Sequence, residues 1–283
     1  MKNTKFISIH GGHSGQFCNH ARDTLEQIIE RYIELEFEWI GITEHVCPVS
    51  NDLRYPDEAA SGLDVNYLAL RFAEYIKTCR EFQQKYRDRI SILTAFETET
   101  YSSYTEFIPA MIRQFQPDYI VGSVHHVDDI CIDYSREDYN RAADSLNGLD
   151  KLYCRYFDIQ YEMIEAIRPA VVGHFDLIRI FDEAYPERIG RPEIWQRITR
   201  NLGLIRQKNI IMDFNLRALM KGASEPYICA PILAEAKKME IRVLPGDDSH
   251  GVSDIGVNME QGVDLLKCAG FDTEWSKPSI YRW

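Results

Sequence analysis

The sequence predicts an α/β barrel of parallel strands, with fewer than eight strand–helix units. Seven short apolar segments alternate along its 283 residues with seven longer segments of helical periodicity. Such alternation implies parallel strands joined by right-handed helical crossovers. Polar, titratable residues follow nearly every predicted strand, as in a barrel whose carboxyl end collects side chains from many strands. An open sheet would instead bind its ligand at one switch point, so we favour a TIM-like barrel.

The predicted strands are short and rich in β-branched and aromatic residues. They cover residues 6–9, 39–43, 90–96, 119–124, 169–173, 210–214 and 241–245. Residues 47–61 form a polar loop, which contains two prolines and is long enough to cover a site. The tail through Trp283 is expected to pack as a last short strand.

The predicted helices show apolar residues at spacings of three and four. Ser102 or Ser103 is a candidate N-cap for the third helix, and Pro192 suits the first turn of the fifth. The helices cover residues 22–36, 65–86, 103–115, 138–166 with a break near Gly148, 192–207, 227–239 and 256–269. No linker, repeat or low-complexity stretch divides the chain, which indicates one domain.

Composition excludes several classes of protein. No run of about 18 apolar residues exists, so no membrane span is expected, and the N-terminus does not resemble a signal peptide. The seven cysteines are widely spaced and odd in number, so we interpret them as reduced thiols of a cytoplasmic protein. A net charge of −12 argues against a nucleic-acid partner, whereas oligomeric state stays open.

The histidines carry the functional signal. All eight lie at, or within one loop of, the carboxyl end of a predicted strand. Imidazole suits zinc, manganese and iron, and one metal needs about four ligands, so this set could hold two or three ions. Carboxylates at the same end could bridge ions. The converging residues are His10, His13, His20, His45, His125, His126, His174, His250, Glu97, Asp247 and Asp248.

A structural role is the alternative for each residue. For His126 it is favoured, because strand alternation points one of the pair His125–His126 away from the barrel axis. For Glu99 it is also favoured, because a bridge needs only one carboxylate and Glu97 precedes it on the same face. His45 and His174 are more readily interpreted as ligands.

The combined pattern resembles the PHP (polymerase and histidinol phosphatase) domain over essentially the whole chain, residues 1–283. Within that family the chain looks most similar to the monofunctional histidinol-phosphate phosphatases. The matching elements are Cys18-Asn-His20, Gly122-Ser-Val-His125, Gly173-His174-Phe-Asp176 and Asp248-Ser-His250.

The resemblance implies a single-domain, distorted (β/α)7 barrel with a trinuclear centre of divalent transition metals, namely zinc, manganese or iron. It implies that Glu97, Asp248 and His250 are catalytic. The implied ligand sets are His10, His13, Glu97 and Asp248 for one ion, His20, His45 and His250 for a second, and Glu97 as a bridge with His125 and His174 for the third.

The sequence departs from the family pattern in three places. The first motif reads His-Gly-Gly-His where the family usually has His-x-His, so either His10 or His13 could be displaced. Glu44 replaces the usual aspartate, and we expect it to act behind a ligand, if at all. The pair Asp247-Asp248 offers two candidates, of which the Asp-x-His spacing favours Asp248.

A multinuclear site suits hydrolysis of a phosphate monoester by a metal-activated hydroxide. The candidate phosphate-binding cations are Arg179, Arg217 and Lys221, while Asn215 and Asp213 could orient substrate or water. The resemblance implies L-histidinol phosphate as substrate, in histidine biosynthesis. The alternatives are another small phosphorylated metabolite or nucleotide, a non-catalytic metal-binding barrel, and an amidohydrolase.

Overall fold

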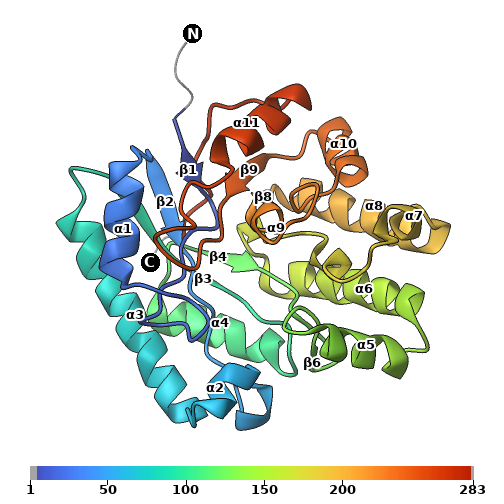
Figure 1. Cartoon of the computed structure of the whole chain (residues 1–283), viewed down its shortest axis with the longest axis horizontal. Helices are drawn as coiled ribbons and strands as arrows, with labels where there is room; N and C mark the ends of the chain where they lie inside the picture. Colours follow the sequence, from blue (N-terminus) through green and yellow to red (C-terminus); the bar gives the residue numbers. More distant parts are fainter. Residues whose placement is uncertain (1–4, 282–283) are drawn as a thin grey trace.

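The computed structural model describes residues 5–281 and shows a nearly closed barrel of seven parallel strands (Figure 1). Around the barrel the order is β1-β2-β3-β4-β7-β8-β9. Backbone hydrogen bonds join the two outer strands, because Ile9 N donates to Pro245 O at 3.0 Å and Asp248 N donates to His10 O at 2.9 Å. The strands are β1 Ile7–Ser8, β2 Trp39–Ile42, β3 Ser91–Glu97, β4 Tyr119–Gly122, β7 Val171–Val172, β8 Ile211–Asn215 and β9 Val243–Gly246.

Side chains fill the barrel interior. The Tyr119 hydroxyl reaches across to donate to Ile9 O at 2.6 Å, and Gly41 leaves room for it, since a Cβ there would lie 1.6 Å from that hydroxyl. No ligand can therefore enter the barrel, and a site has to form at its mouth. The interior cluster consists of Ile7, Ile9, Trp39, Leu93, Ala95, Tyr119, Val121, Val171, Ile211 and Leu244.

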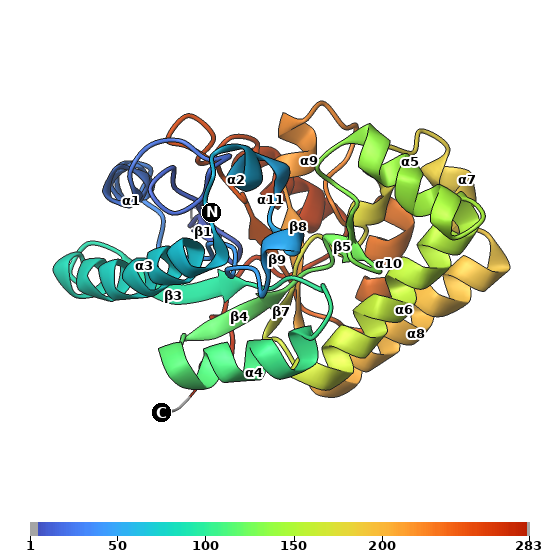
Figure 2. The ribbon, with the colours of Figure 1, turned by 90° about the horizontal axis from the view of Figure 1, so that it is seen from below.

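The outer layer consists of helices whose apolar faces pack on the outside of the barrel (Figures 1 and 2). Thr24 and Gln27 form a capping box at the start of α1, and Asp64 caps α3 by accepting from Tyr67 N at 2.8 Å. These helices are α1 Leu25–Glu34, α3 Val65–Lys85, α4 Tyr104–Phe115, α5 Arg136–Ser145, α6 Leu149–Ile167, α8 Pro192–Lys208, α10 Ala230–Lys238 and α11 Met259–Cys268.

The predicted break near Gly148 is confirmed. Gly148 has φ 120° and separates α5 from α6, a conformation that glycine adopts without steric cost. Ser103 occupies the N-cap position of α4, but its φ is 71° and its side chain makes no capping hydrogen bond. The predicted N-cap position is therefore confirmed for Ser103, although its side chain does not cap the helix.

Several short elements in the loops that follow the strands were not predicted, because they are too short to show periodicity. The segment expected to be a polar loop contains two of them, η1 Asn51–Leu53 and α2 Pro56–Ala60. The others are the antiparallel hairpin of β5 His126–Val127 and β6 Ile130–Cys131, η2 Leu177–Arg179, α7 Tyr185–Ile189 and α9 Arg217–Met220.

The expected last strand is wrong for residues 272–281, which form no strand ladder. This segment instead lies across the amino end of the barrel, where Trp275 Nε1 donates to Lys5 O at 3.1 Å and Tyr281 N donates to Asp118 O at 2.8 Å. Trp283 lies outside the described residues. Within residues 5–281, no helix combines the length and apolar character needed to cross a membrane.

Candidate metal centre

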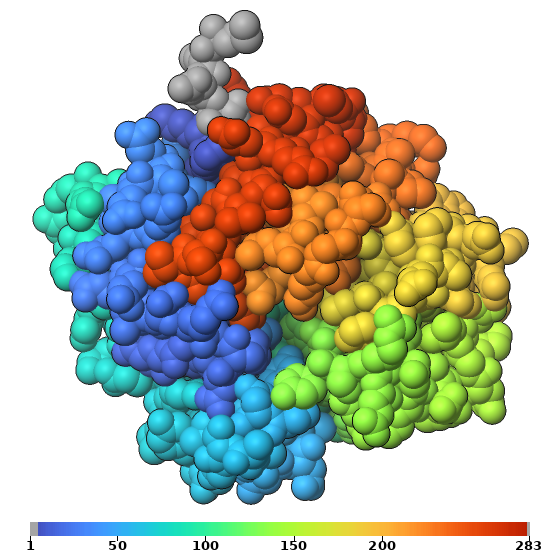
Figure 3. Space-filling view, viewed as in Figure 1, coloured from blue at the N-terminus to red at the C-terminus, as the bar shows by residue number. Residues whose placement is uncertain are grey.

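The predicted site residues meet at the carboxyl end of the barrel, around a cavity of about 190 Å³. Segments from both ends of the chain, coloured blue and red, meet near the centre of this face in the space-filling view (Figure 3). The cavity is lined by His20, His45, Tyr55, Glu97, His125, Asp133, Tyr134, His174, Leu177, Arg217, Lys221, Tyr227, Asp248 and His250.

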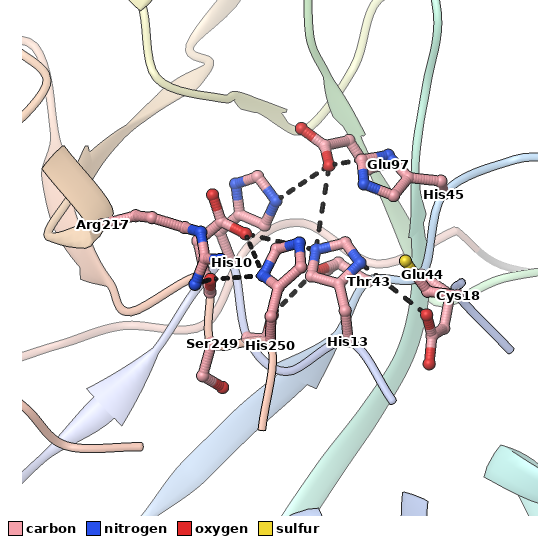
Figure 4. Close-up of polar contacts among 12 residues, drawn as sticks. His10, His13, Cys18, Thr43, Glu44, His45, Glu97, Arg217, Ser249 and His250 are labelled. Carbon is pink, nitrogen blue, oxygen red and sulfur yellow. Dashed lines mark hydrogen bonds and ion pairs between the residues drawn. The ribbon is translucent and has the colours of Figure 1, made fainter. Parts of the chain in front are cut away.

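Glu97 is the central carboxylate. It is the last residue of β3, and its Oε1 lies 2.9 Å from His174 Nε2 and 3.3 Å from His125 Nε2. Its Oε2 faces a different pair, 3.3 Å from both His10 Nε2 and His45 Nδ1 (Figure 4). The two oxygens therefore address two separate groups of imidazoles, as a carboxylate that bridges two ions would.

The extra glycine in the first motif displaces neither histidine. His10 Nε2 lies 3.3 Å and His13 Nε2 3.9 Å from the same Glu97 oxygen. Gly11 permits this path, because a Cβ there would meet Gly41 O at 2.1 Å on the neighbouring strand. The backbone between the two histidines therefore packs tightly against β2 while both rings face Glu97.

A second layer of carboxylates holds the rings. His10 Nδ1 donates to Asp213 Oδ2 at 2.9 Å, and His125 Nδ1 donates to Glu99 Oε2 at 2.9 Å. Each contact fixes the ring orientation and leaves Nε2 directed at Glu97. His126 also contacts Glu99, at 3.2 Å, and does not line the cavity. Glu99 and His126 thus lie behind His125, and Glu99 Oε1 also lies 3.2 Å from His45 Nδ1.

Glu44 and Asp247 also lie behind the cavity. Glu44 Oε1 accepts from Ser14 N and Oγ, while its Oε2 lies 3.7 Å from His13 Nδ1. Asp247 is buried and accepts from the Tyr32 hydroxyl at 2.8 Å, and burial raises the pKa of its carboxyl to about 6. Asp248, the other member of the aspartate pair, faces the imidazoles.

Asp248 and His250 form the opposite wall from Glu97. Asp248 Oδ1 lies 3.3 Å from His13 Nε2. His250 Nδ1 donates to the Asp248 carbonyl oxygen at 3.0 Å, so its Nε2 is the free nitrogen, and its ring stacks on His13 with centroids 4.4 Å apart.

The electrostatics of the site favour a bound cation. Burial alone would lower the pKa of His10, but Glu97, Asp248 and Asp213 outweigh it and raise that pKa well above the usual range. Burial alone would raise the pKa of Glu97, yet the surrounding imidazoles, His10 first, hold it well below its usual range. The buried negative charge is thus balanced only when positive charge lies among the rings.

Buried histidine ring nitrogens that have no hydrogen-bond partner indicate which cation fits. Among the described residues, no hydrogen-bond partner exists for the buried His10 Nε2, for either ring nitrogen of His13, or for His45 Nδ1. Buried polar atoms normally have partners, so a group of such nitrogens next to carboxylates is the donor set of a transition-metal site. Five groups have ligand atoms within 4.8 Å of one another: His10, His13 and Glu97; His10, His174 and Asp248; Glu97, His125 and His174; His45, Glu99 and His125; and His13, Cys18, His45 and His250.

Cys18 is the member of these groups that the sequence reasoning did not assign. The buried Cys18 Sγ lies 3.2 Å from His20 Nε2. His20 stacks on His250 at the rim, with one third of its side chain exposed and centroids 5.1 Å apart. The available signal was the placement of Cys18 two residues before a candidate ligand.

Arg179 does not line this cavity, so its predicted phosphate contact does not fit the structure. Its buried guanidinium pairs with Asp176 at 3.0 Å and donates to Pro226 O at 2.6 Å. The Tyr185 and Tyr227 rings flank it, with centroids 4.8 and 4.6 Å away. Its charge is therefore engaged in packing the segment around Tyr227.

Asn215 is likewise engaged below the cavity. Its Nδ2 donates to Asp213 Oδ2 at 2.9 Å and to Asp248 Oδ2 at 3.1 Å, and its Oδ1 accepts from Arg217 N. The fully buried side chain thus orients two carboxylates and does not line the cavity. Asp213, which contacts His10, is buried in the same way. Arg217 and Lys221 do line the cavity.

We expect Arg179→Ala to lower the free energy of unfolding by about 3 kcal/mol, because it leaves the Asp176 carboxylate buried without its charge partner. Urea denaturation measures this effect. The control is Arg191→Ala, which removes a half-exposed ion pair with Asp150 and should cost less than about 1 kcal/mol. If Arg179→Ala protein is stable but has a strongly raised KM for a phosphate monoester, the structural role assigned to Arg179 would be contradicted.

Residues 11–217 match the PHP domain family. The chain is 34% identical to a probable histidinol-phosphatase from Schizosaccharomyces pombe, over 93% of this chain and 86% of that protein. It is 29% identical to a histidinol-phosphatase from Saccharomyces cerevisiae, over 88% and 84% of the two chains.

Solved structures share the fold. A Listeria monocytogenes protein, itself a candidate histidinol phosphatase, superposes with a TM-score of 0.80 at 25% identity, over 90% of this chain and 99% of that one. A Lactococcus lactis histidinol phosphate phosphatase in complex with zinc, L-histidinol and phosphate gives a TM-score of 0.75 at 18% identity, over 99% of both chains. Sequence and fold together show that this chain belongs to the PHP domain family.

Proposed function

We propose that this chain is a metal-dependent phosphatase that hydrolyses L-histidinol phosphate to L-histidinol and phosphate. The observation that carries the proposal is Glu97, whose two oxygens each face a separate imidazole group at the mouth of the barrel. The family membership and the two yeast relatives named histidinol-phosphatase support this choice among phosphate monoesters.

The donor set suits two to three divalent transition metal ions, zinc, manganese or iron. When bound, such ions activate a water molecule as nucleophile and offset charge on the phosphate. Cys18 adds a sulfur donor beside His45 and His250. The proposed sets are His10, His13, Glu97 and Asp248; His20, His45 and His250; and Glu97, His125 and His174.

The chain itself orients the reactants. Glu97, Asp248 and His250 are the proposed catalytic residues, because all three line the cavity among the proposed ligands. Arg217 donates to the Asp248 carbonyl oxygen at 3.1 Å, which fixes its guanidinium at the cavity wall. Lys221 is exposed beside it and forms no ion pair within residues 5–281, so its ammonium is available to phosphate oxygens.

A phosphate-release assay over phosphorylated metabolites, with zinc, manganese or iron supplied, tests the proposal. We expect L-histidinol phosphate to give the highest kcat/KM. No turnover of it under any metal condition, together with good turnover of another metabolite, would refute the proposed substrate.

We also propose a cytoplasmic location. All seven cysteines are free thiols in the structure, which agrees with a reducing compartment. Localisation of a tagged chain in cells is the direct measurement that tests this proposal.

A further inference from the structure

The walls of the cavity differ in charge. Arg217 and Lys221 come from the segment after β8 and place positive charge on one wall. Asp133 and Tyr134 come from the segment after the β5–β6 hairpin and place a carboxylate and an aromatic ring on another. Of the carboxylates lining the cavity, Asp133 is the one that contacts none of the metal-binding imidazoles.

Asp133 is held in place but not neutralised. Ile132, the residue before Asp133, donates its N–H to His125 O at 2.9 Å, which fixes this part of the backbone next to the segment that follows β4. Asp133 Oδ1 accepts a weak hydrogen bond from Cys131 Sγ at 3.3 Å, and within residues 5–281 the carboxylate forms no ion pair. Arg136, three residues further on, instead donates to Phe181 O at 2.9 Å and lies over the Phe181 ring, 5.4 Å from its centroid.

Aromatic rings line the same cavity as this carboxylate. Tyr55 and Tyr134 lie with ring centroids 6.5 Å apart, and Tyr134 is 43% exposed. The Tyr55 hydroxyl donates to Glu99 Oε1 at 2.9 Å, which fixes its ring. Tyr227 lines the same cavity beside His174. A carboxylate among aromatic faces is a favourable environment for an organic cation, because both attract positive charge.

We propose that Asp133, together with the Tyr55 and Tyr134 rings, binds a cationic group of the substrate, its ammonium or its imidazolium. The phosphate end would then lie toward Arg217 and Lys221. This inference rests on the proposed function, since L-histidinol phosphate carries an imidazole at the end opposite to its phosphate and a primary amine on the carbon between them. Asp133 thereby determines specificity, while the metal ligands determine rate.

The kinetic test compares two monoesters of similar size, L-histidinol phosphate and 3-phenylpropyl phosphate, which has no cationic group. Asp133→Asn should lower kcat/KM for L-histidinol phosphate by about 10- to 100-fold, mainly through KM, as expected for loss of a charged hydrogen bond. The value for 3-phenylpropyl phosphate should stay unchanged. Asp133→Glu, which keeps the charge, should retain much of the preference.

Inhibition by the two products separates the two ends of the site. The inhibition constant of L-histidinol should rise in Asp133→Asn by about 10-fold or more, while that of inorganic phosphate stays unchanged. Glu137→Gln is the matched control, because it removes the same charge from an exposed position four residues away that does not line the cavity. This control should alter neither inhibition constant.

The outcomes distinguish this inference from the proposed function. If wild-type protein hydrolyses L-histidinol phosphate but Asp133→Asn changes neither the substrate preference nor inhibition by L-histidinol, the role of Asp133 is overturned and the function stands. If wild-type protein does not hydrolyse it, the function fails, and 3-aminopropyl phosphate against propyl phosphate becomes the comparison. If wild-type protein prefers 3-aminopropyl phosphate and Asp133→Asn loses this preference, the inference is supported. If the wild-type protein shows no such preference, the inference is overturned.

Discussion

Glu97→Gln is expected to lower kcat by about 10³-fold or more, equivalent to roughly 4 kcal/mol, and to reduce bound metal. The substitution keeps the size of the side chain but removes its negative charge from among five imidazoles. An amide nitrogen replaces one of the two oxygens and is not a ligand. Phosphate release and elemental analysis of the same preparation measure both effects.

Glu99→Gln is the matched control, because the two glutamates are both buried, lie two residues apart and contact the same histidine. Glu99 contacts the Nδ1 side of His125, and a glutamine oxygen can still accept from that nitrogen. We expect a loss of about 10- to 100-fold with metal retained, the usual effect of disturbing the residue behind a ligand. A dead, metal-poor Glu99→Gln beside a near-normal Glu97→Gln would reverse the assignment of the two residues.

The barrel and the convergence of the histidines could be predicted because both follow from local patterns. Parallel strands place their carboxyl ends at one edge, so His45, Glu97 and His174 converge once each is known to follow a strand. In the structure an isolated parallel bridge between His45 and Glu97 continues the β2–β3 pairing into the site. Strand order and the closing contacts set the final distances.

Arg179 shows where such reasoning fails. The sequence says only that an arginine follows His174 by five positions. Its actual environment is set by Tyr227 and Pro226, which lie nearly fifty positions further along the chain. Burial of an arginine depends on such distant partners, and no periodicity encodes them.

The β5–β6 hairpin is a second case. Each of its strands has two residues, which is too short for alternation to be visible. The sequence therefore could not show that Asp133 returns to the cavity next to His125. Cys18 was missed for a related reason, since its contact with His20 depends on a loop turn rather than on a repeating pattern.

Removal of metal should abolish activity. A chelator is expected to reduce phosphate release to background, and zinc, manganese or iron should restore it. Magnesium or calcium should restore little, because these ions prefer oxygen ligands to the imidazoles that dominate this site. Recovery with magnesium alone would contradict the proposed donor set.

The same treatment should lower stability, because a bound ion stabilises only the folded chain. An ion present at a hundred times its dissociation constant contributes about 2.7 kcal/mol, so loss of two to three ions should lower Tm clearly. Without metal, the orphaned nitrogens of His10 and His13 face buried carboxylates and balance them only by taking up protons. Glu97→Gln, which is expected to bind less metal, should show a smaller fall in Tm on chelation than wild type.

Elemental analysis of the purified protein should find two to three equivalents of metal per chain. Full activity with at most one equivalent would refute a multinuclear centre.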